Sequence, residues 1–238
     1  MLSLIALLLA NAGLTSAATA TQPILHTDDT WRYKNATELR GRFNETHDDS
    51  TVVRVQGDAI VLRLHGVDST LQPTELLVGS DWSRFRSVNG KEVAVNRPFA
   101  FPLTPSKTWT VDYTEQHPNR DHLSEHLVSR YTVVGPERVT VAAGTFDAIK
   151  VEGTGTWTAV AAPAIVGVVS TRTDAQGAAV TNRLDRQTAG ETSGRLYRAF
   201  WYVPAVKRAV KTVEEYYDGS GVRYESHTSE LESFRVAE

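Results

Sequence analysis

Apolar and polar residues alternate at a spacing of two along most of the chain after residue 20, which is the pattern of half-buried β-strands. Residues 53–64 show it most clearly, because apolar positions spaced by two lie on both sides of Gly57-Asp58. Asn89-Gly90 and the DGSG stretch at 218–221 separate further strand-like segments. Since both central residues of a type I′ turn need positive φ, these turn sequences predict β-hairpins.

Further strand-like segments fill the middle and the end of the chain: TWTVDYTEQ, HLVSRYTVVG, ERVTVAAG, FDAIKVEGTGTW and WYVPAVKRAVKTVEEYY. Helical periodicity over ten or more residues is hard to find. Consecutive strands joined by short turns pair with each other, which favours an antiparallel sheet. The sequence therefore predicts an all-β, or strongly β-dominated, fold in which a single antiparallel sheet curves into a half-barrel, with a β-sandwich as the alternative.

The first twenty residues have the organisation of a secretory signal peptide. An apolar run at 4–10 is followed by Asn11 and Gly13, and then by small residues that end at Ala20. The run is shorter than the about 20 apolar residues that span a bilayer. No Lys or Arg precedes it, so either the signal is weak or the true start lies upstream. We expect cleavage after Ala20, or as second choice after Ala17.

The mature chain is then expected to be one β-rich domain over 21–238, soluble in the periplasm and without a transmembrane segment. Residues 159–195 depart from its pattern, because an apolar, Ala- and Val-rich run is followed by a polar, Gly- and Thr-rich stretch. A structureless loop of this length is unusual in a compact domain, so this insertion is expected to add strands rather than to form a mobile loop. We hypothesise that it is a flap over a cleft or a docking surface.

Composition narrows the chemistry. The 238 residues include no cysteine, and the formal net charge is −3. Disulfides, thiolate metal sites, a cysteine nucleophile and a lipid-modified cysteine are therefore excluded for this sequence. The slightly acidic balance provides no basic field to attract nucleic acid, which is not expected as a partner.

The stretch HLSEH at 122–126 matches the H-x-x-E-H motif of inverted zinc peptidases. That motif needs a helix, whereas this stretch runs into β-branched and aromatic sequence. In a strand His122 and His126 lie about 13 Å apart, too far to share a zinc ion, and Glu125 points to the other face. A zinc-dependent hydrolase that uses His117, His122, Glu125 and His126 is therefore only the alternative interpretation, and no metal or other cofactor is expected.

Other catalytic patterns are missing from the sequence, including G-x-S-x-G and the glycine-rich phosphate loops. We therefore expect a protein without catalytic residues. The five tryptophans, all in or beside strand-like segments, are the candidate ligand-binding residues: Trp31, Trp82, Trp109, Trp157 and Trp201. They either fill the core, as aromatic residues usually do in β proteins, or line a concave apolar cavity.

Two motifs carry a resemblance. ERVTVAAGTFDAIKVE at 137–152 and FWYVPAVKRAVKTVEEYYDGSG at 200–221 are similar to a family of uncharacterised bacterial periplasmic proteins, with cores V-x-V-x-A-G-T-F-x-A-x-K-V and W-Y-x-P-x-V-x-R. The resemblance implies an envelope domain of unknown function and no catalytic residues. More distantly, the organisation looks like the lipoprotein carriers, whose curved sheet wraps an apolar cleft.

Local structure explains both motifs. Gly144 suits a tight turn, and Pro204, which cannot donate to a β-ladder, is expected at an edge or a bulge. The function expected from the sequence is an exported, periplasmic, non-enzymatic protein that binds an apolar small molecule or an envelope protein in a concave β surface.

Overall fold

A computed structural model describes residues 19–118, 122–162, 164–173, 179–188 and 190–238 of the chain, with the backbone alone at 164–173 and 179–188. The signal peptide expected at 1–20 lies, except for its last two residues, outside the described residues. Within those residues there is no α-helix, and no helix is long and apolar enough to cross a membrane.

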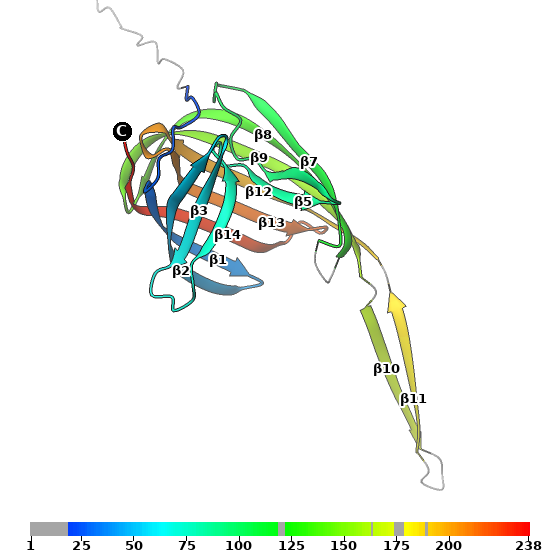
Figure 1. Ribbon diagram of the computed structural model, residues 1–238. Coiled ribbons are helices and arrows are strands. Elements are labelled where there is room, and N and C mark those ends of the chain that lie inside the picture. The colour runs from blue at the N-terminus through cyan, green and yellow to red at the C-terminus, as the bar shows by residue number, and fades with distance from the viewer. Residues whose placement is uncertain (1–18, 119–121, 163, 174–178, 189) are drawn as a thin grey trace, which may run out of the picture.

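Twelve antiparallel strands form one sheet that curves into a nearly closed barrel shape (Figure 1). The strands are β1 (Thr30–Leu39), β2 (Arg42–Gln56), β3 (Ala59–Gly66), β4 (Thr74–Gly79), β5 (Arg84–Val88), β6 (Lys91–Asn96), β7 (Thr108–Gln116), β8 (His122–Val141), β9 (Gly144–Ala161), β12 (Glu191–Val203), β13 (Arg208–Asp218) and β14 (Arg223–Arg235). Their order across the sheet is β6-β5-β4-β3-β2-β1-β14-β13-β12-β9-β8-β7. The predicted single curved antiparallel sheet is confirmed, and it closes further than a half-barrel.

Side chains of β5 and of the β5–β6 turn contact the edge strand β7, where no ladder forms. The Asn89 side chain of the β5–β6 turn donates to the Thr114 carbonyl and accepts from the Gln116 N–H, at 3.1 and 3.2 Å. Arg86 pairs with Glu115 at 2.7 Å beside it. The asparagine predicted to shape a turn therefore also occupies backbone groups of an edge strand that would otherwise be open to other chains.

The segment at 159–195 extends the strands and adds a hairpin. Its first residues complete β9, its last residues begin β12, and between them β10 (Ala164–Thr173) and β11 (Ala179–Thr188) pair as a separate two-stranded sheet. Figure 1 shows this hairpin extending away from the barrel-shaped sheet. The expectation of added strands agrees with this backbone, and the flap or docking role stays a hypothesis.

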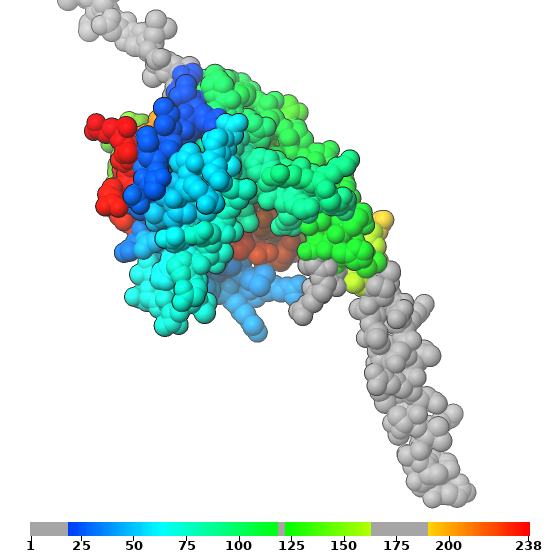
Figure 2. Space-filling model, viewed as in Figure 1, coloured from blue at the N-terminus to red at the C-terminus, as the bar shows by residue number. Residues whose placement is uncertain are grey.

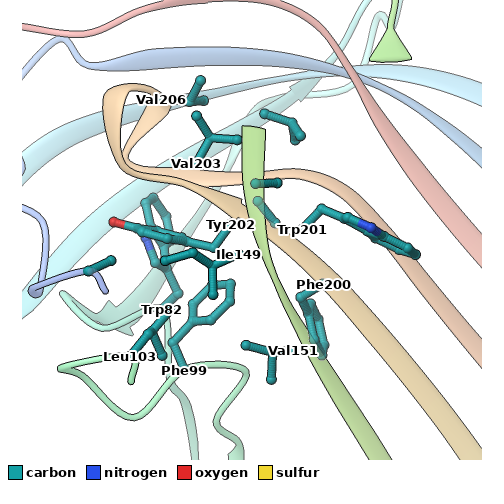
Figure 3. Close-up of a cluster of buried hydrophobic side chains, with 14 of the residues drawn as sticks. Trp82, Phe99, Leu103, Ile149, Val151, Phe200, Trp201, Tyr202, Val203 and Val206 are labelled. Atoms are coloured by element: carbon teal, nitrogen blue, oxygen red, sulfur yellow. The ribbon is translucent and has the colours of Figure 1, made fainter. Parts of the chain in front are cut away.

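Most of the aromatic core lies near one end of the sheet, beside the connection from β12 to β13. Phe99 contacts Phe200 and Tyr202, with ring centroids 5.9 and 5.0 Å apart, and Leu103 is fully buried against them (Figure 3). We call this end the corner end. Neighbouring strands of the main sheet run in opposite directions, so its loops and turns lie at either end of it. The β3–β4 loop and the β13–β14 turn lie at the end opposite to the corner end.

The hairpin at residues 53–64 forms as predicted, although its inward residues differ. A register shift between Val52 and Arg54 places Val53 in a bulge. Val52 therefore faces Leu62 in the core and is fully buried, while Val53 is half-buried. A bulge moves the side chains of one strand segment to the other face without altering the period of two on either side.

Gly194 in β12 has no room for a side chain. A Cβ there would clash with the Tyr217 main-chain oxygen and lie 2.7 Å from Trp157 Nε1. We expect Gly194→Ala to lower the free energy of unfolding by at least about 2 kcal/mol through overpacking. Gly190→Ala is the matched control, because nothing lies within 4 Å of its Cβ position. Urea unfolding of the two variants measures the difference, and equal stabilities would contradict this packing.

Ala20 belongs to the folded domain. It is 5% exposed and pairs with Leu103 through two main-chain hydrogen bonds of 3.0 and 2.7 Å. Cleavage after Ala20 removes this bridge, whereas cleavage after Ala17 keeps it. We therefore expect cleavage of the predicted signal peptide after Ala17, so that the mature chain begins at Ala18. N-terminal sequencing of periplasmic material tests this, and a mature chain that starts at Thr21 would overturn it.

Candidate functional site

The W-Y-x-P-x-V-x-R motif forms the corner between β12 and β13. Pro204–Val206 makes a single 3-10 turn, and Lys207 closes it in the left-handed region at φ 62°. Proline fixes its own φ and needs no backbone donor at the first position of such a turn, so the sequence favours a sharp corner here. Arg208, the last residue of the motif, begins β13.

Three aromatic side chains from distant segments hold this corner in place. The indole N–H of Trp31 donates to the Val206 carbonyl at 2.8 Å, and that of Trp82 donates to the Lys207 carbonyl at 2.9 Å. The Tyr33 hydroxyl donates to the Ala209 carbonyl. Main-chain oxygens that the corner removes from the β-ladder are thus satisfied by side chains.

The same three rings surround the Arg208 guanidinium. Its central carbon lies 4.6 Å from the ring centroid of Trp82, 4.9 Å from that of Tyr33 and 5.4 Å from that of Trp31. Burial raises the pKa of Tyr33 to about 12, so its phenol is neutral near pH 7 and is not a counter-ion. The cation is stabilised by ring faces, each contributing about 0.5–2 kcal/mol.

Two neighbouring cations at the corner differ in their partners. Lys207 Nζ lies 3.3 Å from a carboxylate oxygen of Asp29, which is 1% exposed. Arg208 has no such carboxylate among the described residues, and its one hydrogen bond there is from Nη1 to Ser50 Oγ, at 2.9 Å. Burial lowers the pKa of Arg208, because water no longer surrounds the charge. A guanidinium has five N–H donors, so most of them remain for another partner.

Arg208 lines a cavity of about 1000 Å³ inside the barrel-shaped sheet, the lumen cavity. Its lining comes from β1 to β6, the β3–β4 loop, β13 and β14. Arg208, Arg84 and Asn96 lie toward the corner end, and Leu71 and Gln72 of the β3–β4 loop lie toward the opposite end. Figure 2 shows a hollow between the cyan and green parts of the surface, through which β13 and β14 are visible.

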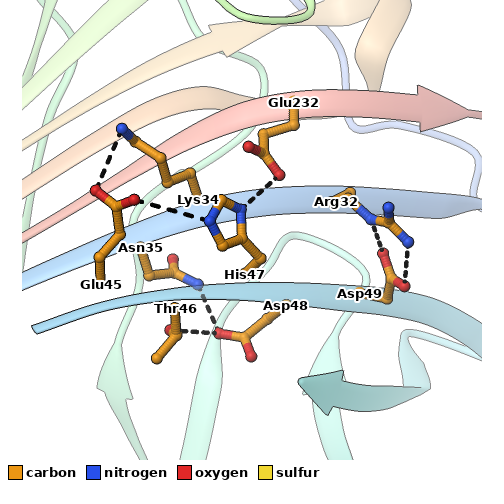
Figure 4. Close-up of polar contacts among 9 residues, drawn as sticks. All are labelled: Arg32, Lys34, Asn35, Glu45, Thr46, His47, Asp48, Asp49 and Glu232. Carbon is orange, nitrogen blue, oxygen red and sulfur yellow. Dashed lines mark hydrogen bonds and ion pairs between the residues drawn. The ribbon is translucent and has the colours of Figure 1, made fainter. Parts of the chain in front are cut away.

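Polar side chains of β1 and β2 line one wall of this cavity. Asp48 accepts hydrogen bonds from Asn35 Nδ2 at 2.6 Å and from the Thr46 hydroxyl at 3.2 Å (Figure 4). Across the cavity, Asn96 Oδ1 is buried and has no hydrogen-bond partner among the described residues. The cavity lining therefore includes carboxylate, hydroxyl and amide groups as well as the guanidinium.

On the outer face of the same strands the charges pair with each other. His47 Nδ1 lies 3.0 Å from Glu232, and Lys34 lies 3.3 Å from Glu45 (Figure 4). These groups are about 40% exposed, apart from the more buried Glu232. Solvent-exposed pairs of this kind contribute about 0–1 kcal/mol each, so they are a solvated surface rather than a site.

A second, more deeply buried arginine lies further along the lumen, and its charge is paired within the protein. Arg198 is 6% exposed, and its Nε lies 2.9 Å from Glu214 Oε2, an ion pair that is not aligned as a hydrogen bond. It also donates to the hydroxyls of Tyr131 and Tyr216, at 2.9 and 3.2 Å. Because its charge is compensated, Arg198 is a structural crosslink between β12, β13 and β8.

The HLSEH stretch is a strand, as expected, and its histidines diverge. His126 lies 2.9 Å from Asp112 on the outer face. The expectation that Glu125 points away from both histidines is wrong for His122, whose Nδ1 lies 3.1 Å from Glu125, because a register shift follows His122. His117 is exposed in the turn before the strand. Among the described residues, no three His, Asp or Glu side chains are grouped to hold a metal ion.

The structure separates the five candidate tryptophans. Trp31 and Trp82 make an edge-to-face contact, with centroids 5.3 Å apart, and both are buried. Trp201 is also buried and belongs to the core cluster (Figure 3), and the ammonium groups of Lys150 and Lys211 lie over its ring, at 5.1 and 5.9 Å from the centroid.

The other two tryptophans are half-buried. Trp109 stacks on Tyr131, with centroids 5.5 Å apart, and Trp157 lies 6.2 Å from the His122 ring. No tryptophan is among the residues that line the lumen cavity. Only Trp31 and Trp82 reach the site, through Arg208, so direct ligand binding by the five tryptophans stays a prediction.

Sequence reasoning missed Arg208 itself. The motif that ends at Arg208 was explained by the turn around Pro204, and that turn is present. Two adjacent cations, at 207 and 208, directly follow an apolar corner in the sequence. This pattern could have identified Arg208, because a charge in an apolar environment needs a partner. The identity of that partner depends on residues more than 100 positions away.

No family model matches the chain, and neither does any curated protein. Two solved structures are similar to it in fold. An inferred exported protein with a YmcC-like fold from Bacteroides fragilis has 13% identity and a TM-score of 0.44. An inferred lipoprotein from Parabacteroides distasonis has 14% identity and a TM-score of 0.46. In each case the match covers 91% of this chain and 99% of the other. The resemblance to periplasmic proteins therefore rests on the two sequence motifs.

The corner depends on its indole hydrogen bonds. We expect Trp31→Phe to lower the free energy of unfolding by about 1–3 kcal/mol, because the buried Val206 carbonyl loses its donor. Trp109→Phe is the control, since its bond to the Arg97 carbonyl is exposed and water can replace it. Chemical denaturation measures both, and an equal loss in the control would show that ring volume rather than the hydrogen bond matters.

Proposed function

We propose that this chain is an exported binding protein without catalytic function, which holds a small molecule in its lumen cavity. The observation that carries the proposal is the cavity itself. At about 1000 Å³ it is at the upper end of the range typical of small-molecule sites. Its lining is built on strands of the sheet, and rigid elements position binding groups better than loops do.

The shape of the cavity supports a small molecule rather than a protein partner. The aromatic core fills the corner end of the barrel-shaped sheet, and the cavity extends from there toward the β3–β4 loop. A protein surface has no segment available to fill such a recess unless an extended loop enters it. A small molecule can be enclosed on most sides, as pocket ligands usually are.

The lining supports an amphipathic ligand, which refines the apolar ligand expected from the sequence. Leu64 and Leu71 provide aliphatic surface, whereas Asn35, Asp48 and Thr212 provide polar groups. A wholly apolar molecule would remove water from the polar groups of the lining that have no protein partner, at a cost of about 1–3 kcal/mol each. A molecule with both kinds of surface satisfies the two sides of the cavity.

A zinc-dependent hydrolase is less well supported. His122 and His126 have different carboxylate partners, Glu125 and Asp112, and the second pair lies on the outer face. Shared coordination requires ligand atoms about 2 Å from one ion. The periplasmic location is part of the proposal and is supported by the signal-peptide pattern at 1–20.

A lumen-filling variant tests the proposal. Ser229 in β14 lines the cavity, and the preceding residue, Thr228, faces the other side of the sheet. We expect native mass spectrometry of protein purified gently from the periplasm to detect a small bound molecule on the wild type and on Thr228→Trp. Ser229→Trp should lose it, because the indole occupies the ligand volume.

Metal analysis of the same samples accompanies the measurement. A wild-type protein without any bound mass, or a bound mass that Ser229→Trp retains in full, would contradict binding in the lumen. Stoichiometric zinc that disappears in the His122→Ala, His126→Ala double variant would favour the hydrolase instead.

A further inference from the structure

Arg208 is a partly buried cation whose charge the protein stabilises but does not neutralise. Transfer of a charged group from water into a protein costs several kcal/mol unless it is paired. The three rings around Arg208 offset part of this cost through cation–π attraction. Ring faces attract the charge but accept no directional hydrogen bond in the guanidinium plane, so the N–H groups at the cavity still lack acceptors.

The other charges around the cavity do not complete this pair. Glu214 lies beside Arg198, and Asp48 accepts from Asn35 and Thr46. Arg84 of β5 also lines the cavity and has no ion pair within the part of the chain that the structure describes. Among the described residues, the corner end of the cavity therefore carries two guanidinium groups without a carboxylate partner: Arg208, which donates to the Ser50 hydroxyl, and Arg84, which is exposed.

The structure also holds Arg208 ready to bind. The rings that cover it are fixed by their own hydrogen bonds to the corner, and Ser50 fixes one guanidinium nitrogen. Such preorganisation lowers the entropic cost of binding. A cation needed only for packing would be expected to have a carboxylate partner, as Lys207 has in Asp29.

We propose that the lumen cavity recognises its ligand through an oxyanion, a carboxylate or a phosphate, which the Arg208 guanidinium binds at the corner end. The planar fork of arginine matches either group with two parallel hydrogen bonds. The inference rests on the proposed function for the location of the ligand, and it adds the chemical group by which the ligand is held.

Small oxyanions test the site without knowledge of the natural ligand. The mature protein is titrated with sodium phosphate and, separately, with sodium acetate, at constant ionic strength in sodium chloride. Tryptophan fluorescence is the readout, because the rings of Trp31 and Trp82 cover the guanidinium. We expect a saturable response to at least one anion, and the preferred anion distinguishes a phosphate-bearing from a carboxylate-bearing ligand.

Three variants locate the response. Arg208→Gln should weaken binding of the preferred anion by about tenfold or more, the effect of losing hydrogen bonds to a charged group. Arg63→Gln removes the same charge from the outer face, where Arg63 pairs with the exposed Glu75, and should change the dissociation constant less than about twofold. If Arg208→Gln does not fold, Arg208→Lys is titrated instead, because lysine keeps the charge but lacks the planar fork. Weaker binding of the anion to Arg208→Lys supports the proposal, and unchanged binding overturns it.

The outcomes separate this inference from the proposed function. A response that is not saturable, or that persists unchanged in Arg208→Gln, overturns the oxyanion site. If Ser229→Trp nevertheless displaces a bound molecule, the lumen binds a ligand that has no oxyanion at Arg208. If phosphate or acetate binds at Arg208 but the wild type from the periplasm carries no molecule, the anion site stands and the proposed function fails.

Discussion

The hydrogen bonds that anchor the corner after β12 are the constraint on which the rest of the structure depends. Trp31, Tyr33 and Trp82 donate to three carbonyls within the four residues 206–209. Their partners are 125 to 176 positions away in the sequence, so each bond ties the first half of the sheet to the second. Because β1 and β14 pair in the middle of the sheet, these bonds fix its curvature where the two halves meet.

The same bonds determine the chemistry of the lumen. An indole that donates in its own plane presents its face sideways, and here those faces are directed at Arg208. The hydrogen bonds that stabilise the fold thus also create a preorganised cationic site. Arg198 provides the contrast within the same lumen, because Glu214 compensates its charge and two tyrosine hydroxyls accept its hydrogen bonds.

The fold was more accessible from the sequence than the site. The period of two and turns such as Asn89-Gly90 are local signals, and they predicted the strands, the antiparallel pairing and the curved sheet. Bulges are harder to predict from the sequence. The bulges at Val53 and after His122 changed which residues share a face of their strands, compared with the regular alternation. The side chains around Arg208 come from three segments that are far apart in the sequence and meet because the sheet curves. No local sequence pattern predicts these contacts.

The division of the interior into two regions explains how the protein can keep a large cavity. Empty volume in a core lowers stability, by about 24 cal/mol for each Å³ in apolar sites. The corner end avoids that cost, since Phe99, Phe200 and Tyr202 pack there around fully buried aliphatic residues. The remaining volume is lined by polar as well as aliphatic groups, and water or a ligand can satisfy the polar ones. The packed core and the lumen cavity therefore occupy different halves of one barrel-shaped sheet, with Arg208 at the boundary between them.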